Sequence, residues 1–154
     1  MSLPTLVSSR VAGTGSAFPE RIVGNEELCR LIQQAIVSTS TKHTEEGVEG
    51  FGPEWIRERT GIETRHFLGP GESLSGLCAV AAESALAAAQ VPLAAIDGIL
   101  VATCTPEQAI PATAAIVHRR LGARKAFAID LNAACSGFHH AWAMGHAMIA
   151  SGQA

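Results

Sequence analysis

The sequence predicts an α/β fold built around a mostly parallel, buried sheet. Segments with strand character alternate along the chain with segments of helical periodicity, an order that is typical of parallel α/β sheets. Two strand-like runs, residues 98–104 and 126–132, are continuously apolar instead of alternating, as expected of strands covered on both faces. The chain has 154 residues, 47% of them hydrophobic and 16% charged, so it can bury a sizeable core.

The N-terminal part is predicted to begin with a strand at residues 5–12 that leads into a glycine pair. The pair at 13–15 favours a tight turn, because the third glycine of a dinucleotide-binding loop is missing. A helix is expected next, with Asn25 as its N-cap and apolar residues at helical spacing behind it. Residues 38–53 carry glycines and a proline without a sustained period, so they are predicted to form a long loop.

Two helices are predicted in the middle of the chain. Pro53 favours the start of a short helix, and Gly61 can end it in a left-handed conformation. Trp55 and Arg59 are then one helical turn apart. The alanine-rich segment 73–90 has strong helix propensity, and its small side chains allow close packing on a sheet.

Two further helices are predicted around the second apolar strand. One opens at Pro111 and closes at Gly122, and the other covers residues 133–153. The last helix carries apolar side chains around much of its circumference, so we expect a complementary half of the protein to cover it.

Composition and charge exclude several classes of function. The net charge of -3 and the pI near 6.0 provide no basic field, so nucleic-acid binding is not expected. No signal peptide or bilayer-spanning run stands out, so we expect a cytoplasmic protein without a membrane partner. The four cysteines lack zinc-site spacing, and neither a metal site nor a disulfide is predicted.

A thiol at the end of the second apolar strand is the candidate nucleophile. Cys135 lies where strand 126–132 ends and the last helix begins, and the carboxyl ends of strands collect chemistry in open α/β sheets. The first turn of a helix favours thiolate over thiol. The small neighbours at 133–137 leave room for an acyl chain and for backbone N–H groups to approach an oxyanion. The alternative is a small buried cysteine at a tightly packed helix start.

Four stretches resemble one known family in its own order. They are GTGSAFPERIVGNEEL, EWIRERTGIETRHF, GILVATCTPEQAIPATAAIVHRRLG and DLNAACSGF. Together they resemble the condensing enzymes of the thiolase superfamily, most closely the β-ketoacyl-acyl-carrier-protein synthase III family. The resemblance implies a thiolase-like layered fold, in which residues 1–154 form the N-terminal, first βαβαβ-type half.

The resemblance also implies roles for individual residues. Cys135 would be acylated by an acyl-CoA, so coenzyme A enters as a thioester substrate and no cofactor is permanently bound. Trp55 would stack on the adenine of coenzyme A, Arg59 would hold its phosphates, and Thr60 would lie beside them. Ile110 matches a position that reaches the acyl pocket of a partner subunit, which implies a homodimer. The acyl acceptor would be a malonyl group on acyl-carrier protein, as in fatty-acid biosynthesis.

The sequence departs from the family pattern after the thiol. The family's histidine and asparagine for condensation belong to a second half, so we expect residues 1–154 alone to be inactive. His139 and His146 lie on the face of Cys135, but helix packing explains them more simply. Two alternatives stay open: acyl transfer to an oxygen or nitrogen nucleophile in secondary metabolism, and a non-catalytic half that supplies an acyl-CoA or assembly surface.

Overall fold

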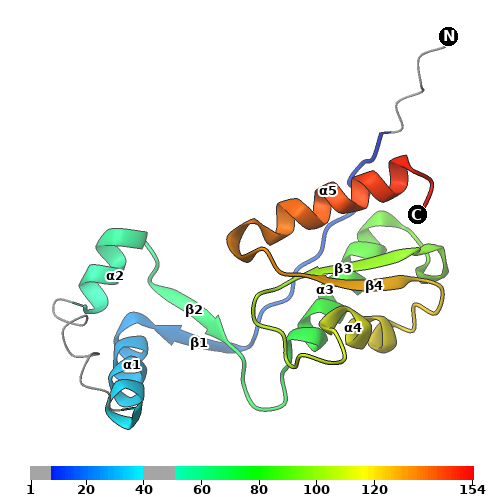
Figure 1. Ribbon diagram of the computed structural model, residues 1–154. Helices are drawn as coiled ribbons and strands as arrows, with labels where there is room; N and C mark the ends of the chain where they lie inside the picture. The colour runs from blue at the N-terminus through cyan, green and yellow to red at the C-terminus, as the bar shows by residue number, and fades with distance from the viewer. Residues whose placement is uncertain (1–7, 40–50) are drawn as a thin grey trace. The chain divides into compact units, whose positions relative to one another are not determined.

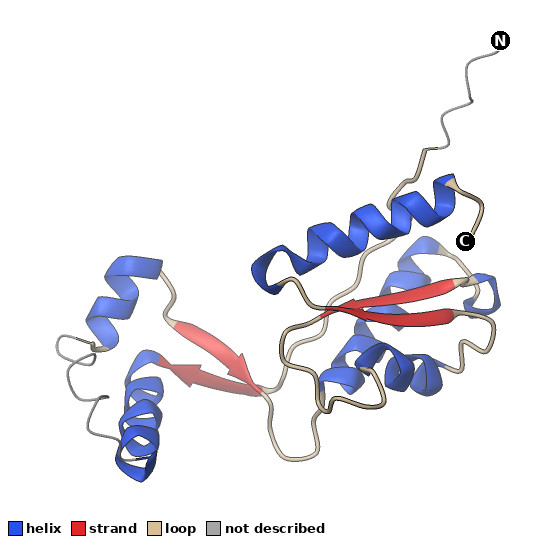
Figure 2. Cartoon of the chain, in the orientation of Figure 1, coloured by secondary structure: helices blue, strands red, loops and turns tan. Residues whose placement is uncertain are grey.

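The computed structural model describes residues 8–39 and 51–154, which belong to two compact units. The larger unit comprises Met1–Ala17 and Glu72–Ala154, and the smaller unit comprises Phe18–Gly71. The α/β class predicted from the sequence is confirmed, since each unit combines a two-stranded sheet with helices (Figure 2).

The larger unit is built on a parallel pair of strands. Strand β3 (Gly98–Ala102) pairs with β4 (Phe127–Leu131) in a register that runs from Gly98 opposite Phe127 to Ala102 opposite Leu131. Helix α5 (Gly137–Ala150) covers one face of this sheet, while α3 (Leu74–Ala89) and α4 (Thr113–Leu121) lie on the other (Figure 1). The predicted parallel strands are therefore present, and helices cover both of their faces.

The alternation of side chains along β3 divides the core between the two faces. Val101 packs with Ala114 and Val117 of α4, and all three are buried. Leu100 points to the opposite face, where its Cδ1 would lie 3.6 Å from a Cβ added at Gly145 of α5. The continuous apolar run predicted from the sequence thus serves both faces at once.

Local capping signals explain where the helices of the larger unit begin and end. The Ser73 hydroxyl accepts a hydrogen bond of 3.1 Å from the Gly76 N–H, which makes it the N-cap of α3. Helix α3 ends at Gln90, whose φ is 54°, and α4 ends at Gly122, whose φ is 74°. The predicted ends at Gln90 and Gly122 are confirmed.

The N-terminal prediction is wrong in its details. Residues 8–12 form neither helix nor strand, and residues 5–7 of the predicted strand lie outside the described residues. The glycine pair forms no turn. Instead, a Cβ at Gly15 would lie 2.1 Å from the Ala81 carbonyl oxygen, so the pair allows the chain to approach α3 closely.

The smaller unit contains an antiparallel sheet that was not predicted from the sequence. Strand β1 (Arg21–Gly24) pairs with β2 (Thr64–Phe67), and the helices α1 (Asn25–Thr39) and α2 (Pro53–Thr60) complete the unit. Both strands are four residues long and carry charged or polar side chains, so neither resembles a buried run. The predicted short helix is confirmed, including its start at Pro53.

Asn25 does not act as the predicted N-cap. Its Nδ2 donates hydrogen bonds to the carbonyl oxygens of Pro53 (3.3 Å) and Ile62 (3.0 Å), and so ties the start of α1 to the start of α2 and to the segment that follows α2. Its Oδ1 is buried and finds no partner in the described residues. The predicted loop 38–53 lies for the most part outside the described residues, and its first two residues belong to α1.

In the part of the chain that the structure describes, no helix combines the length and the apolar character needed to cross a bilayer.

We predict that Gly15→Ala destabilises the protein by about 1–3 kcal/mol, because the new Cβ would meet backbone atoms of α3 that cannot move aside. Gly145→Ala is the matched control, since its Cβ would make an ordinary 3.6 Å contact with Leu100. Chemical unfolding of both variants in the full chain measures the difference. Equal stability of the two variants would contradict the close approach of residue 15 to α3.

Candidate active site

Cys135 lies in a single 3-10 turn between β4 and α5. The turn, η2 (Ala134–Ser136), follows the strand after two residues, and α5 starts directly behind it. The Cys135 side chain is exposed, so the alternative of a buried structural cysteine does not describe this position in the chain. A reagent or substrate can therefore reach the thiol.

The backbone around Cys135 is held in an uncommon conformation. Ala134 has a φ of 45°, in the left-handed region that residues with a Cβ rarely adopt. The Ala133 carbonyl oxygen accepts bonds from the Ser136 N–H (3.1 Å) and the Ser136 hydroxyl (2.8 Å). The Asn132 Oδ1 accepts a longer bond of 3.4 Å from the Ala134 N–H. These bonds hold the thiol on a sharp strand-to-helix turn.

The start of α5 follows directly after the thiol and has no side-chain cap. Ser136 occupies the N-cap position but makes no side-chain cap hydrogen bond. Gly137 is buried against β3, where an added Cβ would lie 3.3 Å from the Ala102 Cβ. The glycine therefore has a packing role, because it lets the helix start close to the end of β3. The Gly137 N–H donates to the Ala134 carbonyl oxygen. The first turn of a helix without a side-chain cap is a place where further N–H groups can bind a negatively charged oxygen.

Cys135 borders a hollow of about 790 Å³ within the larger unit. One wall is α3, whose contributing side chains are small, among them Ala81 and Ala85. Strand β3 also lines the hollow, together with Phe138 and Trp142 of α5, which are 64% and 51% exposed. An apolar hollow beside an exposed thiol suits a nonpolar group carried on sulfur.

A second thiol, that of Cys78, lines the same hollow from α3. Partial burial raises the pKa of Cys78, and the negative charges of Glu107 and Asp130 raise it further. The Cys78 thiol is therefore held in its neutral form at neutral pH. Of the two thiols at the hollow, Cys135 is the exposed one.

Two carboxylates near the hollow bind helix starts, a role that the sequence did not predict. Asp130 of β4 accepts hydrogen bonds of 2.7 Å from the N–H groups of both Thr113 and Ala114, at the start of α4. Glu107 accepts a bond of 2.6 Å from the Ser75 N–H at the start of α3. A charged residue inside an apolar strand is the one signal that pointed to Asp130, while Glu107 lies in a loop and gives no signal.

The smaller unit brings together two of the predicted coenzyme A residues. The Arg59 guanidinium carbon lies 5.7 Å from the centroid of the Trp55 ring, and the Phe51 ring lies 5.5 Å from the same ring. Trp55 is 43% exposed. In the described residues Arg59 forms no ion pair, whereas its helix neighbour Arg57 pairs with Glu54. An exposed aromatic ring beside an unpaired guanidinium can take a planar base and an anion.

Thr60 and Ile110 lie in different surroundings. The Thr60 hydroxyl donates to the Ile56 carbonyl oxygen at 2.7 Å and accepts from the Ile62 N–H at 3.0 Å, so it closes the end of α2. Ile110 lies in the larger unit, and its side chain is 87% exposed. Trp55, Arg59 and Thr60 share α2 and its end, while Cys135 and Ile110 belong to the other unit.

The two histidines considered as partners of the thiol lie outside the lining of the hollow. The His139 ring makes an edge contact with Phe138 at 6.0 Å between centroids. His146 Nδ1 lies 2.9 Å from the Ser9 hydroxyl oxygen. Both contacts agree with packing and tethering roles on α5.

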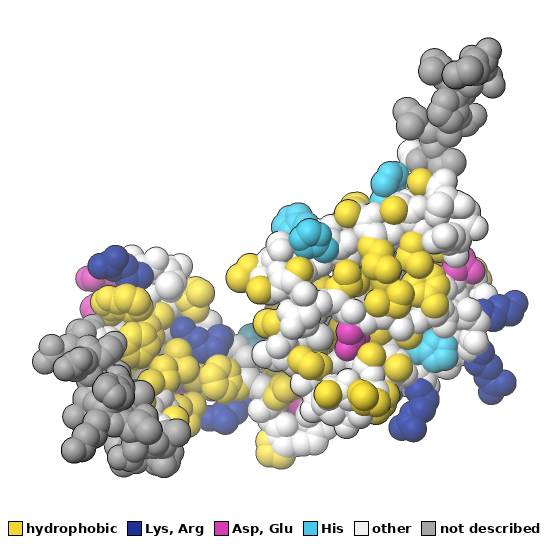
Figure 3. All heavy atoms as spheres, in the orientation of Figure 1, with side chains coloured by type: hydrophobic (Ala, Val, Ile, Leu, Met, Phe, Trp, Pro, Cys, Tyr) yellow, Lys and Arg dark blue, Asp and Glu magenta, His cyan; other side chains and the backbone are white. Residues whose placement is uncertain are grey.

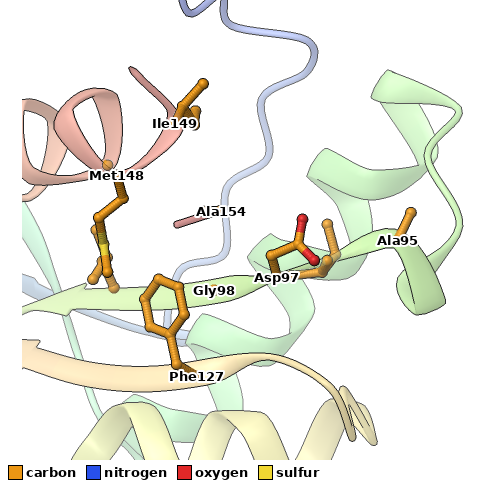
Figure 4. A pocket seen from close by; sticks show the side chains of 10 residues that line it. Ala95, Asp97, Gly98, Phe127, Met148, Ile149 and Ala154 are labelled. Carbon is orange, nitrogen blue, oxygen red and sulfur yellow. The ribbon is translucent and has the colours of Figure 1, made fainter. Parts of the chain in front are cut away.

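A smaller hollow of about 250 Å³ lies at the opposite end of α5 (Figure 4). Phe127, Met148 and Ile149 give it apolar walls, and Asp97 is its charged side chain. Hydrophobic side chains gather on the surface beside α5 in this part of the larger unit (Figure 3). No thiol, hydroxyl or imidazole is among the residues that line this hollow.

Across residues 8–39 and 51–154, no three or more His, Cys, Asp or Glu side chains are grouped so that they could hold a metal ion.

The chain is similar in sequence to part of two curated bacterial proteins. It is 42% identical to β-ketoacyl-acyl-carrier-protein synthase III of Granulibacter bethesdensis over 146 residues, which cover 95% of this chain and 40% of that protein. The protein of the same name from Roseiflexus castenholzii is 40% identical over 144 residues, covering 94% and 38%. This chain thus spans about two fifths of the length of these relatives. No protein-family model matches it.

Solved structures resemble the chain over the same extent. The crystal structure of 3-oxoacyl-acyl-carrier-protein synthase III from Aquifex aeolicus VF5 matches with a TM-score of 0.77 and 30% identity, covering 94% of this chain and 41% of that one. The priming β-ketosynthase of the R1128 polyketide biosynthetic pathway matches with a TM-score of 0.75 and 34% identity, covering 99% and 40%.

We predict that alkylation of Cys78 by iodoacetamide has its midpoint above the pH of an ordinary thiol, because burial and two carboxylates disfavour the Cys78 thiolate. Glu107→Gln removes one of those charges and should move the midpoint to lower pH. Peptide mass spectrometry across a pH series measures the modified fraction. A midpoint at or below about 8.5, the value of a free cysteine, would contradict the prediction.

Proposed function

Because this chain is homologous over nearly its whole length to the N-terminal part of the β-ketoacyl-acyl-carrier-protein synthases III, and has their thiolase-like fold, we propose that the protein is a condensing acyltransferase with Cys135 as its nucleophile. The observation that carries the proposal is the exposed Cys135 thiol, which stands on a strained turn at the start of α5 and borders an apolar hollow.

The first step is transfer of an acyl group from an acyl-CoA to Cys135. The Cys135 sulfur attacks the thioester carbonyl carbon, and the bond between that carbon and the coenzyme A sulfur breaks. Coenzyme A leaves as the free thiol with the proton lost by Cys135, so the step changes no oxidation state. Backbone N–H groups at the start of α5, where no side chain caps the helix, would hold the oxyanion that forms on the way.

The second step is decarboxylative condensation with a malonyl thioester on acyl-carrier protein. Loss of carbon dioxide leaves the electron pair on the α-carbon, which attacks the acyl-cysteine carbonyl. A carbon–carbon bond forms, and the Cys135 sulfur leaves with the electrons of its bond to carbon. The histidine and asparagine that the family resemblance implies for this step would come from outside residues 1–154.

Coenzyme A binding is the role we propose for the exposed face of α2. The Trp55 ring would stack on the adenine, and the Arg59 guanidinium beside it would pair with phosphate. Thr60 already uses its hydroxyl to close the helix, so its contribution would be to keep α2 in shape.

Ile110 completes the proposal as a residue of a dimer interface. An isoleucine that is 87% exposed leaves apolar surface in water, and insertion into the acyl pocket of a second copy would bury it. The proposed protein is therefore a cytoplasmic homodimer that starts fatty-acid chains.

We predict that Cys135→Ala abolishes acylation, because Cys135 is the cysteine that stands on the strand-to-helix turn at the start of α5. Full-length protein is mixed with acetyl-CoA, and intact-mass and peptide mass spectrometry locate the acyl group. Cys104→Ala, which removes the other exposed cysteine, is the matched control and should be acylated like the wild type. Acyl mass retained in Cys135→Ala would overturn the assignment, and an unacylated wild type would support a non-catalytic role.

Release of carbon dioxide from malonyl-acyl-carrier protein by the acylated protein separates condensation from transfer to another nucleophile. If the acylated protein releases no carbon dioxide from malonyl-acyl-carrier protein and instead passes its acyl group to an alcohol or an amine, the reaction is acyl transfer and condensation is contradicted.

We predict that Trp55→Ala and Arg59→Ala raise KM for acyl-CoA and change kcat less. Loss of stacking on one base weakens binding by about 1–3 kcal/mol, or roughly 5-fold to 150-fold. Arg57→Ala is the matched control, because Arg57 lies on the same helix but is paired with Glu54. Steady-state kinetics of the full-length enzyme give both constants. An unchanged KM in both Trp55→Ala and Arg59→Ala would contradict the proposal that coenzyme A binds to this face of α2.

A further inference from the structure

The loop between β3 and α4, residues 103–112, exposes one large apolar side chain. Ile110 is 87% exposed, the highest value among the exposed large hydrophobic side chains of the described residues. A free loop would let such a side chain turn inward and escape water. Contacts on both sides of Ile110 hold the loop in place instead.

The first contact joins the loop to the start of α3. Glu107 Oε1 accepts a 2.6 Å hydrogen bond from the Ser75 N–H, and Glu107 Oε2 accepts a 3.2 Å bond from the Ser75 hydroxyl. Ser75 is completely buried. A carboxylate bound to the first turn of a helix gains from the charge of the bond and from the helix dipole.

Arg120 of α4 strengthens this contact from the other side. Its Nε donates to the Ser75 hydroxyl at 3.1 Å, and its guanidinium also donates to the Ser73 hydroxyl at 3.3 Å. The bond from the Ser75 N–H is the main cause that lowers the pKa of Glu107, and the Ser75 hydroxyl and the Arg120 charge lower it further. The Glu107 side chain is therefore ionised at neutral pH.

The second contact lies behind Ile110. Asp130 accepts hydrogen bonds of 2.7 Å from the Thr113 and Ala114 N–H groups and so fixes the start of α4. Ile110 stands three residues after Glu107 and three residues before Thr113. A segment this short, bound at both ends, has little freedom to move.

We propose that Glu107 is a positioning residue, which holds the loop 103–112 against the start of α3 and so fixes where Ile110 meets the acyl chain. The inference rests on the proposed function, in which Ile110 enters an acyl pocket. Glu107 does not touch the acyl chain itself. It acts through the loop, and the ability of the enzyme to distinguish short from long acyl chains depends on it.

The test compares four full-length variants with the wild type. Glu107→Ala removes both acceptors, while Glu107→Gln keeps one oxygen that can accept from the Ser75 N–H. Gln108→Ala, a change of the adjacent exposed loop residue, is the matched control. Ile110→Ala shows what loss of the apolar side chain itself does.

Two readouts are measured together with the melting temperature. Hydrogen exchange follows the Ser75 amide and the loop amides, and needs no activity. Competition between acetyl-CoA and octanoyl-CoA for the enzyme gives the ratio of the two kcat/KM values. We expect Glu107→Ala to speed exchange at Ser75 at least tenfold and to change the ratio about threefold to tenfold, in the direction of Ile110→Ala. Glu107→Gln should restore part of both effects, and Gln108→Ala should cause neither.

The outcomes distinguish the inference from the function on which it rests. Unchanged exchange at Ser75 in Glu107→Ala overturns the positioning role of Glu107. An unchanged ratio in Glu107→Ala, with a changed ratio in Ile110→Ala, also overturns it. If the ratio of the two kcat/KM values is unchanged in Ile110→Ala, Ile110 does not contact the acyl chain, and the positioning role of Glu107 is overturned as well. An unacylated wild-type Cys135 overturns the proposed function, and the exchange at Ser75 still decides whether Glu107 holds the loop.

Discussion

The larger unit depends on one carboxylate, that of Asp130. A helix begins with backbone N–H groups that have no partner within the helix, and α4 has no side-chain cap at Ala112. Asp130 supplies an oxygen to each of the first two such groups, at Thr113 and Ala114. Because Asp130 belongs to β4, the start of α4 is bound to the strand that leads to Cys135. Asp130 therefore connects the end of the loop before α4 to the strand that precedes the Cys135 turn.

Small side chains determine how closely the other elements approach one another. Gly15 lets the N-terminal segment reach the backbone of α3, and Gly137 lets α5 begin against Ala102. The alanines of α3 that line the hollow leave space that larger residues would fill, and Cys135 borders that space. Close packing at the glycines and open space at the alanines together produce an apolar hollow beside an accessible thiol.

Features that depend on neighbouring residues were predicted well. The start of α2 at Pro53, its left-handed end at Gly61, and the ends of α3 and α4 follow from capping rules that act within one helical turn. The contact between Trp55 and Arg59 follows from helical spacing. The short antiparallel sheet was missed, because its pairing joins residues about forty positions apart and its strands do not alternate between apolar and polar residues.

The sequence by itself determined the α/β class, the parallel pair of strands, and the place of Cys135 between a strand and a helix. Those features depend on apolar runs and on residue types within a few positions. Only the tertiary structure decided which side chains satisfy the helix ends, since Asp130 and Glu107 bind N–H groups that lie 16 to 32 positions away along the chain. It also made Asn25 a donor to two carbonyl groups instead of a cap. A backbone N–H or carbonyl group without a partner in its own helix bonds to a polar side chain that folding brings near it. Residues close together in the sequence do not show which side chain that will be.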